Sequence, residues 1–277
     1  MFASRLLQQS GRALSLSSTR SLASAAAATS PALPEYLLRV PPTRVSVLSN
    51  GMRVATEQSV GETATVGVFI NAGSSFETAE ESGIAHFLEH MSFKGTSTRT
   101  QHSIEQEVEH MGASLNAFTS REQTVYYANV FKDKLGQGVD LLSDILQNSK
   151  YDPKHIEAER NTILLELEDT EANAQEMVMD HLHAASFQNS SLGNTILGPV
   201  ENIKRISRDD LIKYVKSHYT ADRMVLAAAG AVDHDALCDM AEKAFAKLPA
   251  SGNSPAPTAA YFTPGMVEHV DESMEDL

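Results

Sequence analysis

The hydrophobic positions of this chain follow a two-residue repeat in some stretches and a helical repeat in others. Thr63–Asn71 alternates and is rich in β-branched residues, which predicts a strand. Residues 45–48 and 52–56 flank Asn50-Gly51, a strong turn signal, so they are predicted to form a hairpin. Three further strands are predicted at 114–120, 123–130 and 224–229.

Helical patterns separate these strands. Ser82 is suited to cap a helix that begins beside it, and the predicted helix 102–111 precedes Gly112, a natural helix stop. Asp152-Pro153 marks the start of a long helix that continues through Glu166 toward Ala185. Other predicted helices are one with the apolar face Val139, Leu142, Ile145 and Leu146, then 208–218 and 234–247. The alternation predicts an α+β domain with a mixed, mainly antiparallel sheet covered by helices.

Both ends of the chain differ from this region. Residues 1–34 contain three arginines, many serines and alanines and no acid, which is typical of a mitochondrial transit peptide; a merely disordered tail is the alternative. Residues 249–257 are rich in Pro, Ser and Ala, as linkers are. We therefore expect the folded domain at 40–248, with 249–277 forming a linker and the start of a further domain.

Composition narrows the function classes. A formal net charge of −14 argues against a general nucleic-acid binder, and it suits either a solvated surface or a protein that handles basic peptides. The single cysteine, Cys238, cannot form an intrachain disulfide and fits a reducing compartment. No run of 18 apolar residues predicts a membrane span.

The most informative stretch is Gly83-Ile-Ala-His-Phe-Leu-Glu-His-Met91. On a helix, His86 and His90 project from one face one turn apart, so both rings can reach a single Zn²⁺. Glu89 would lie beside the metal, where it could act on a water whose pKa the metal lowers. The order His-x-x-Glu-His is the inverted form of the common zinc-peptidase helix. Surface histidines that bind nothing are the alternative.

The residues alone leave the third metal ligand open. Glu159 and Glu166 are two helical turns apart and share a face, and Glu176 and Asp180 share another. A helix with many acids is more often simply solvated. His181 and His183 point to different sides of a helix and make a poor chelating pair.

Several longer segments carry a resemblance that covers about 45–246. The matching segments are Ala85-His-Phe-Leu-Glu-His-Met91, Phe93-Lys-Gly-Thr96, Leu115-Asn-Ala-Phe-Thr-Ser-Arg-Glu-Gln-Thr-Val-Tyr-Tyr-Ala128, Leu142-Ser-Asp-Ile-Leu-Gln-Asn-Ser149, Asp180-His-Leu-His-Ala184, Thr195-Ile-Leu-Gly-Pro199 and Arg223-Met-Val-Leu-Ala-Ala-Ala-Gly230. With them the chain resembles the family of mitochondrial processing peptidase β subunits, close kin of the core-1 subunits of respiratory complex III. That family has a second, similar half, which would help to enclose a substrate.

The resemblance implies roles for individual residues. It implies zinc held by His86, His90 and Glu166, with Glu89 as the general base and Glu159 supporting catalysis without binding the metal. For the substrate, it implies a pocket at Phe93 for the residue after the cut. It implies an edge strand to which the peptide adds itself, and an acidic pair that receives an arginine shortly before the cut. These substrate residues are Asn116, Ala117, Phe118, Glu176 and Asp180.

The resemblance also implies a function. We expect a zinc metalloendopeptidase that removes presequences from imported proteins, with one Zn²⁺ per β subunit and an α subunit as heterodimer partner. Its expected place is the mitochondrial matrix or the matrix face of the inner membrane. A structural core subunit of complex III, with little or no peptidase activity, is the alternative hypothesis. A scaffold would not need His86, Glu89, His90, Glu159 and Glu166 together, so the sequence favours the enzyme.

Overall fold

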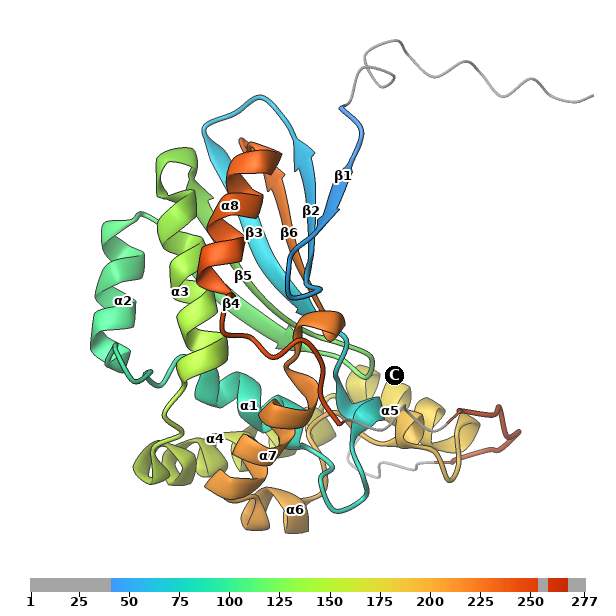
Figure 1. The fold of residues 1–277 in the computed structure, drawn as a ribbon. Helices are drawn as coiled ribbons and strands as arrows, with labels where there is room; N and C mark the ends of the chain where they lie inside the picture. Colours follow the sequence, from blue (N-terminus) through green and yellow to red (C-terminus); the bar gives the residue numbers. More distant parts are fainter. Residues whose placement is uncertain (1–40, 254–258, 269–277) are drawn as a thin grey trace, which may run out of the picture. The chain divides into compact units, whose positions relative to one another are not determined.

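A six-stranded sheet organises the part of the chain that the computed structural model describes, which is residues 41–253 and 259–268 (Figure 1). The strand order is β1-β2-β6-β3-β5-β4, and neighbouring strands are antiparallel except for the parallel pair β2 and β6. This confirms the predicted mixed, mainly antiparallel sheet. The strands are β1 (Arg44–Val47), β2 (Arg53–Gln58), β3 (Thr63–Ile70), β4 (Ser114–Thr119), β5 (Thr124–Phe131) and β6 (Met224–Gly230).

The helices surround the sheet in two groups. In Figure 1, α3 (Leu135–Asn148) and α8 (His234–Ala244) cover one face of the sheet, with α2 (Gln101–His110) outside α3. The second group lies at one end of the strands: α1 (Ile84–Ser92), α4 (Pro153–Ala172), α5 (Ala174–Ser186), α6 (Val200–Arg205) and α7 (Arg208–His218). Short 3₁₀ turns complete the list: η2 (Ser74–Phe76), η3 (Lys132–Lys134), η4 (Ser191–Gly193) and η5 (Ala221–Arg223).

The core lies between the sheet and α3. Val66, Val68 and Ile70 of β3 are fully buried, as the alternating pattern predicts. They belong to the same apolar cluster as Val139 and Leu142 of the predicted α3 face. Burial of this kind contributes about 1.5–3 kcal/mol per large aliphatic side chain. The core therefore fixes the end of the sheet against which α1 packs.

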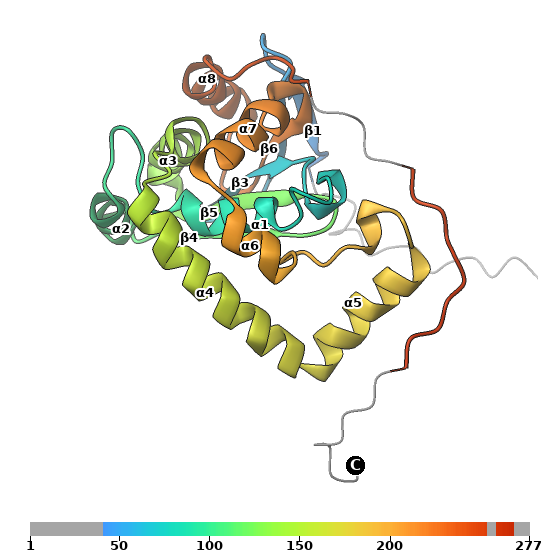
Figure 2. The same cartoon turned by 90° about the horizontal axis from the view of Figure 1, so that it is seen from below.

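Two predictions about helices were wrong, and one short helix was missed. The long helix expected from Pro153 toward Ala185 is two helices, and Figure 2 shows α4 and α5 meeting at an angle. Asn173 causes the break, because its side-chain oxygen accepts from the backbone N–H groups of Gln175 and Glu176 and so caps a new helix. The short helix α6 was not predicted. Ser82 does not cap α1 through its side chain.

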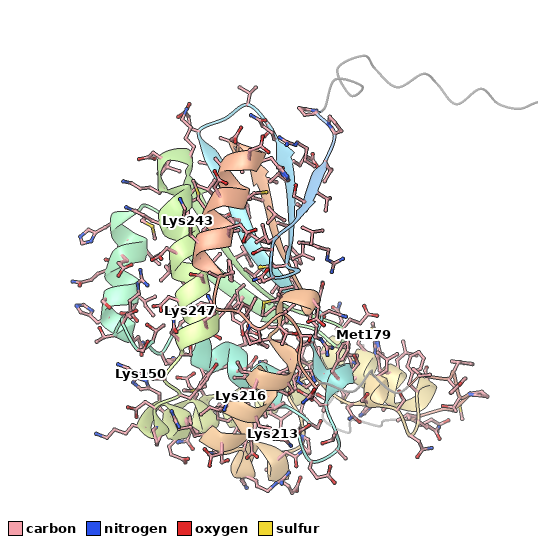
Figure 3. All side chains as sticks on the ribbon, viewed as in Figure 1. Lys150, Met179, Lys213, Lys216, Lys243 and Lys247 are labelled. Carbon is pink, nitrogen blue, oxygen red and sulfur yellow. The ribbon has the colours of Figure 1, made fainter. Side chains whose placement is uncertain are left out.

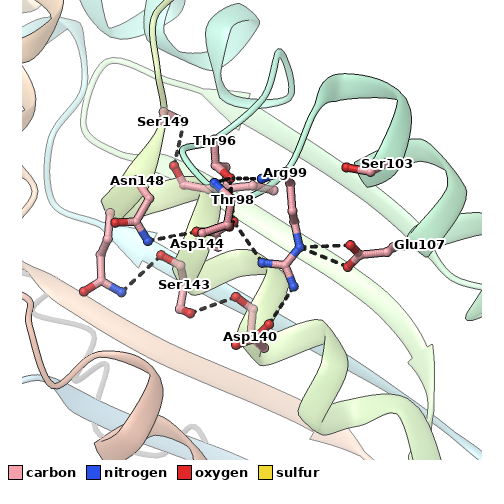
Figure 4. Close-up of polar contacts among 12 residues, drawn as sticks. Thr96, Thr98, Arg99, Ser103, Glu107, Asp140, Ser143, Asp144, Asn148 and Ser149 are labelled. Atoms are coloured by element: carbon pink, nitrogen blue, oxygen red, sulfur yellow. Dashed lines mark hydrogen bonds and ion pairs between the residues drawn. The ribbon is translucent and has the colours of Figure 1, made fainter.

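A polar network joins α2 and α3 to the segment after α1 (Figure 4). Arg99 donates to Glu107, Asp140 and Asp144, at 2.7–3.1 Å. Asp144, only 7 % exposed, also accepts from the hydroxyl groups of Thr96 and Thr98. Because its carboxylate is hydrogen-bonded by several partners, the buried charge is compensated. The network therefore holds the segment 96–99 against α3.

The outer surface of α5 is apolar. Val178, Met179 and Leu182 are 60 %, 49 % and 54 % exposed, and Figure 3 shows Met179 projecting from this helix. The same figure shows Lys213 and Lys216 on α7 and Lys243 on α8. No helix in residues 41–253 and 259–268 is long and apolar enough to cross a membrane. The predicted leader 1–34 lies outside the described residues, as do 254–258 and 269–277 of the predicted linker segment.

Candidate active site

Helix α1 carries the histidine motif in the middle of the fold. Ile84, Phe87, Leu88 and Met91 are buried and anchor one side of the helix in the core. His86 is 6 % exposed, whereas Glu89 and His90 are partly exposed. The spacing that predicted a shared face is confirmed, because the two imidazole rings lie with their centroids 4.7 Å apart. The buried apolar side chains thus fix the helix so that its two imidazoles lie together, where a third side chain can reach both.

The start of α1 is held by a buried carboxyl group, that of Glu77, in place of the predicted Ser82 cap. Its two oxygens accept from the backbone N–H groups of Gly83 and Ala85, both at 2.8 Å. Gly83 has a φ of 96°, in the left-handed region that glycine adopts without strain. Burial raises the pKa of Glu77 to about 8, although these N–H groups oppose the shift. The orientation of the histidine helix therefore depends on one acid from the preceding loop.

Glu166 of α4 is the acid that meets the two imidazoles. Its oxygens lie 3.4 Å from His86 Nε2 and 3.1 Å from His90 Nε2. Ligand atoms from all three residues lie within 4.8 Å of one another, which would let them hold one metal ion. Two atoms bound tetrahedrally to zinc at about 2.0–2.1 Å are roughly 3.3–3.4 Å apart. The residues present therefore fit zinc, with three protein ligands.

The pKa shifts follow from this contact. Hydrogen bonds from His86 and then His90 lower the pKa of Glu166 well below its ordinary value, and partial burial opposes them only weakly. Burial lowers the pKa of His90, but hydrogen bonds to Glu166 and Glu159 outweigh it and raise the pKa overall. The site thus concentrates negative charge where a cation would bind.

Glu159 approaches the same histidine from its other nitrogen. Its Oε2 lies 3.2 Å from His90 Nδ1, and its Oε1 lies 2.6 Å from the ammonium of Lys94. Glu159 and Glu166 lie two turns apart on the same face of α4, as their spacing predicted. A carboxylate on the second nitrogen of a metal-binding histidine fixes the ring and its tautomer. The structure therefore places Glu159 beside the metal cluster and outside the group of three ligands.

Glu89 differs from its neighbours because it has no assigned partner. Among the described residues, no hydrogen bond or ion pair engages its carboxylate. It lies on α1 three residues after His86 and one before His90. A carboxylate that is not occupied by other groups can exchange a proton with water in the site.

The predicted substrate residues lie on three different elements. Phe93 follows α1, is partly buried, and meets the buried Tyr126 edge-to-face with ring centroids 6.4 Å apart. Asn116, Ala117 and Phe118 belong to β4, which is an edge strand of the sheet. Phe118 is 43 % exposed, and Asn116 Oδ1 accepts from the backbone N–H of Ala117 at 2.8 Å. The outer edge of β4 is therefore unpaired, and the Asn116 side chain covers the backbone N–H of Ala117.

Both members of the predicted arginine-binding pair on α5, Glu176 and Asp180, already have partners within the chain. Glu176 is exposed and contacts Asn173 Nδ2 at 3.3 Å. Asp180 is paired with Arg121, from the turn between β4 and β5. Arg121 is itself only 12 % exposed, and its backbone is held to η2 by a hydrogen bond from Ser75. An internal arginine thus occupies one member of the pair.

Comparison with known families assigns this arrangement. Residues 53–200, which contain α1, α4 and the whole cluster, match the family described as Insulinase (Peptidase family M16). The chain belongs to peptidase family M16. Residues 205–273 match a second description, Peptidase M16 inactive domain.

Curated members of this family are similar over most of the chain. Mitochondrial-processing peptidase subunit beta of Blastocladiella emersonii is 54 % identical over 86 % of this chain and 51 % of its own length. The Homo sapiens protein of that name is 50 % identical over 87 % of this chain and 50 % of its own length. The Bos taurus protein is 48 % identical over 99 % of this chain and 55 % of its own length. The chain therefore spans about half the length of the curated relatives it matches.

One solved structure shares the fold of this chain. The crystal structure of a protease from Helicobacter pylori superposes with a TM-score of 0.73 at 22 % identity. The match covers 80 % of this chain and 54 % of that one. At this identity the likeness concerns the fold alone.

Three residues of this M16 chain were not assigned any role from the sequence. Glu77 gave no signal, because it lies seven residues before the start of α1 and outside any helical pattern. Lys94 belongs to the matching segment Phe93-Lys-Gly-Thr96 and Arg121 to a longer matching segment, but neither segment indicated a role for them. Their contacts depend on how α4 and α5 pack on the rest of the fold.

Proposed function

We propose that this chain is the metal-binding, catalytic half of a mitochondrial processing peptidase β subunit. It would act as a zinc metalloendopeptidase that removes N-terminal presequences from imported proteins. The observation that supports this most directly is the cluster of His86, His90 and Glu166, with the unpaired Glu89 on the same helix. The names of relatives at 48–54 % identity point the same way.

In this proposal His86, His90 and Glu166 hold one Zn²⁺. The bound ion supplies Lewis acidity, which polarises a peptide carbonyl and makes water easier to deprotonate. Glu89 takes a proton from the attacking water and later delivers it to the departing amine nitrogen. Glu159 keeps the His90 ring in place throughout. Each role falls on a residue whose position in the site permits it.

The charge around the site suits a basic peptide. Helices α4 and α5, residues 153–186, contain eight acids and only two lysines or arginines. Such a surface attracts and orients cationic presequences, and the attraction weakens as salt rises. Glu176 and Asp180 would receive an arginine before the cut, and Phe93 would contact the residue after it.

The peptide backbone would bind at the edge of the sheet. An extended substrate can add itself beside β4, using backbone groups near Asn116, Ala117 and Phe118. The Asn116 side chain would then have to leave the N–H of Ala117, which it covers in the absence of substrate. An α subunit would complete the enclosure of the peptide.

The expected setting follows from the relatives. We place the protein in the mitochondrial matrix or at the matrix face of the inner membrane, in a heterodimer with an α subunit. A structural role in complex III is not favoured, since a scaffold would not need the full set of site residues.

The test measures zinc content and cleavage of a presequence peptide by the chain with an α subunit. We expect one zinc per chain in the wild type. Glu89→Gln should keep the zinc and lose cleavage by about 10²–10⁴-fold, the usual contribution of a general acid–base group. Glu105→Gln, an exposed acid on α2, is the matched control and should change neither. Near-normal turnover by Glu89→Gln, or no zinc in the wild type, would contradict the proposal.

A further inference from the structure

Lys94 is a cation inside an acidic metal site, and none of the roles above uses it. It lies two residues after the end of α1, and its side chain is 24 % exposed. Its Nζ lies 2.6 Å from Glu159 Oε1, and the other oxygen of Glu159 contacts His90 Nδ1. Glu159 is only 12 % exposed, so both contacts are largely shielded from water. Charge-assisted hydrogen bonds of this kind are short and strong.

The backbone around Lys94 is held on both sides. Lys94 N–H donates to Met91 O in the last turn of α1, at 3.2 Å. Gly95 has a φ of 108°, which lets the chain turn sharply after the helix, and its carbonyl accepts from Lys150 N–H. Thr96 then donates to Asp144 at 2.6 Å, in the network of Figure 4. The base of the Lys94 side chain is therefore fixed between α1 and α3.

The contacts fix the direction in which the His90 ring points. Glu159 Oε2 contacts His90 Nδ1 at 3.2 Å, while Nε2, on the far side of the ring, faces Glu166 at 3.1 Å. With Nδ1 engaged by a carboxylate, Nε2 is the nitrogen turned toward the other two metal ligands. Lys94 restrains this carboxylate, because it holds the opposite oxygen of Glu159.

We propose that Lys94 is a positioning residue for the metal, acting through Glu159 on the orientation of the His90 ring. The inference deepens the proposed function, since it rests on the same metal site. It differs from a simple ion pair that ties the end of α1 to α4. Such a pair would affect stability, but it would not act on the metal through Glu159.

The experiment compares zinc affinity in the full 277-residue chain, measured by competition with a chromogenic chelator. Lys94→Met keeps the apolar stem and removes the charge, and we expect roughly ten-fold weaker zinc binding, at the low end for groups behind metal ligands. Lys94→Arg should restore most of the affinity. The matched control is Lys132→Met, which removes another lysine–carboxylate pair, with Glu62 at 2.9 Å, and should leave zinc affinity unchanged.

A double-mutant cycle tests whether Glu159 transmits the effect. In a Glu159→Gln background, Lys94→Met should cause little further loss of zinc affinity. Urea unfolding of each variant reports stability separately from zinc binding.

The outcomes separate this inference from the proposed function. Unchanged zinc affinity in Lys94→Met, or an equal loss with and without Glu159, would overturn the role of Lys94. Lowered stability with normal zinc affinity would also overturn it, in favour of a structural ion pair. A wild type that binds zinc but does not cleave presequences would contradict only the peptidase proposal, and the Lys94 effect on zinc would still stand.

Discussion

Arg121 donates to Asp180 at 2.5 Å and ties the turn between β4 and β5 to helix α5. Arg121 is 12 % exposed and Asp180 30 %, so the pair is sheltered. A guanidinium from the protein itself thus occupies a carboxylate that we propose to receive the guanidinium of a substrate. Any arginine that binds there must share Asp180 or displace Arg121.

The first prediction concerns this competition. Arg121→Gln should free Asp180 and raise the preference for peptides with arginine over alanine two residues before the cut. A charge-assisted hydrogen bond is worth about 1.5–3 kcal/mol, so the ratio of kcat/KM values should rise roughly ten-fold. A fall in the ratio would mean that Arg121 holds Asp180 in its binding position and does not compete.

The second prediction concerns the acidic pair itself. Replacing Glu176 and Asp180 by Gln and Asn should lower cleavage of the arginine peptide about ten-fold or more, and spare the alanine peptide. The matched control is Glu168→Gln with Asp169→Asn, two exposed acids on α4. If the α5 variant lost activity equally on both peptides, the pair would lie outside the arginine site.

The third prediction concerns the metal ligands. His86→Ala and Glu166→Ala should each lower zinc content, because either change leaves only two protein ligands. Atomic absorption on purified protein measures this directly. His102→Ala serves as the control, since its side chain is 77 % exposed on α2. Normal zinc content in both variants would show that neither His86 nor Glu166 binds the metal.

The sequence was most informative where chemistry depends on local spacing. The i, i+4 relation of His86 and His90 specifies one face of one helix, and the structure has them together. The same rule could not choose between Glu159 and Glu166, because they share a face of α4 and both reach His90. Which of them meets Nε2 depends on how α4 packs across α1. That packing is tertiary, so the choice came from resemblance.

Local rules also failed where a polar side chain interrupts or caps a helix. Asn173 lies inside a helical pattern, and only its side-chain hydrogen bonds reveal that α5 begins there. Glu77 caps α1 from six residues upstream of Gly83, across a loop. Such caps depend on the path of the chain in three dimensions, which periodicity does not describe.

The fourth prediction concerns the network of Figure 4. Asp144→Ala removes a carboxylate that is 7 % exposed, so we expect a loss of about 3 kcal/mol in the free energy of unfolding. Asp140→Ala removes another acid from the same arginine, but Asp140 is 65 % exposed and should cost less than about 1 kcal/mol. Urea unfolding of the metal-free variants measures both. Equal costs would show that burial does not govern this network.

The last prediction concerns Glu77 and pH. Burial raises its pKa from 4.5 to about 8, so the folded chain keeps a proton there that the unfolded chain releases. The stability contributed by protonated Glu77 is complete below pH 4.5 and is lost as pH rises toward about 8. In this window the free energy of unfolding should fall by up to about 1.4 kcal/mol per pH unit on account of this group.

Glu77→Gln isolates this contribution, because glutamine stays neutral and can still accept one of the two N–H hydrogen bonds. The variant should be less stable than the wild type at pH 5, and its deficit should shrink or reverse by pH 8.5. Glu81→Gln is the matched control. Burial alone would raise the pKa of Glu81, but Lys213 outweighs burial and lowers it, so this variant should alter the profile only below about pH 4.5. If the Glu77→Gln deficit grew with pH, Glu77 would be ionised in the folded chain, stabilising α1 as a charged cap.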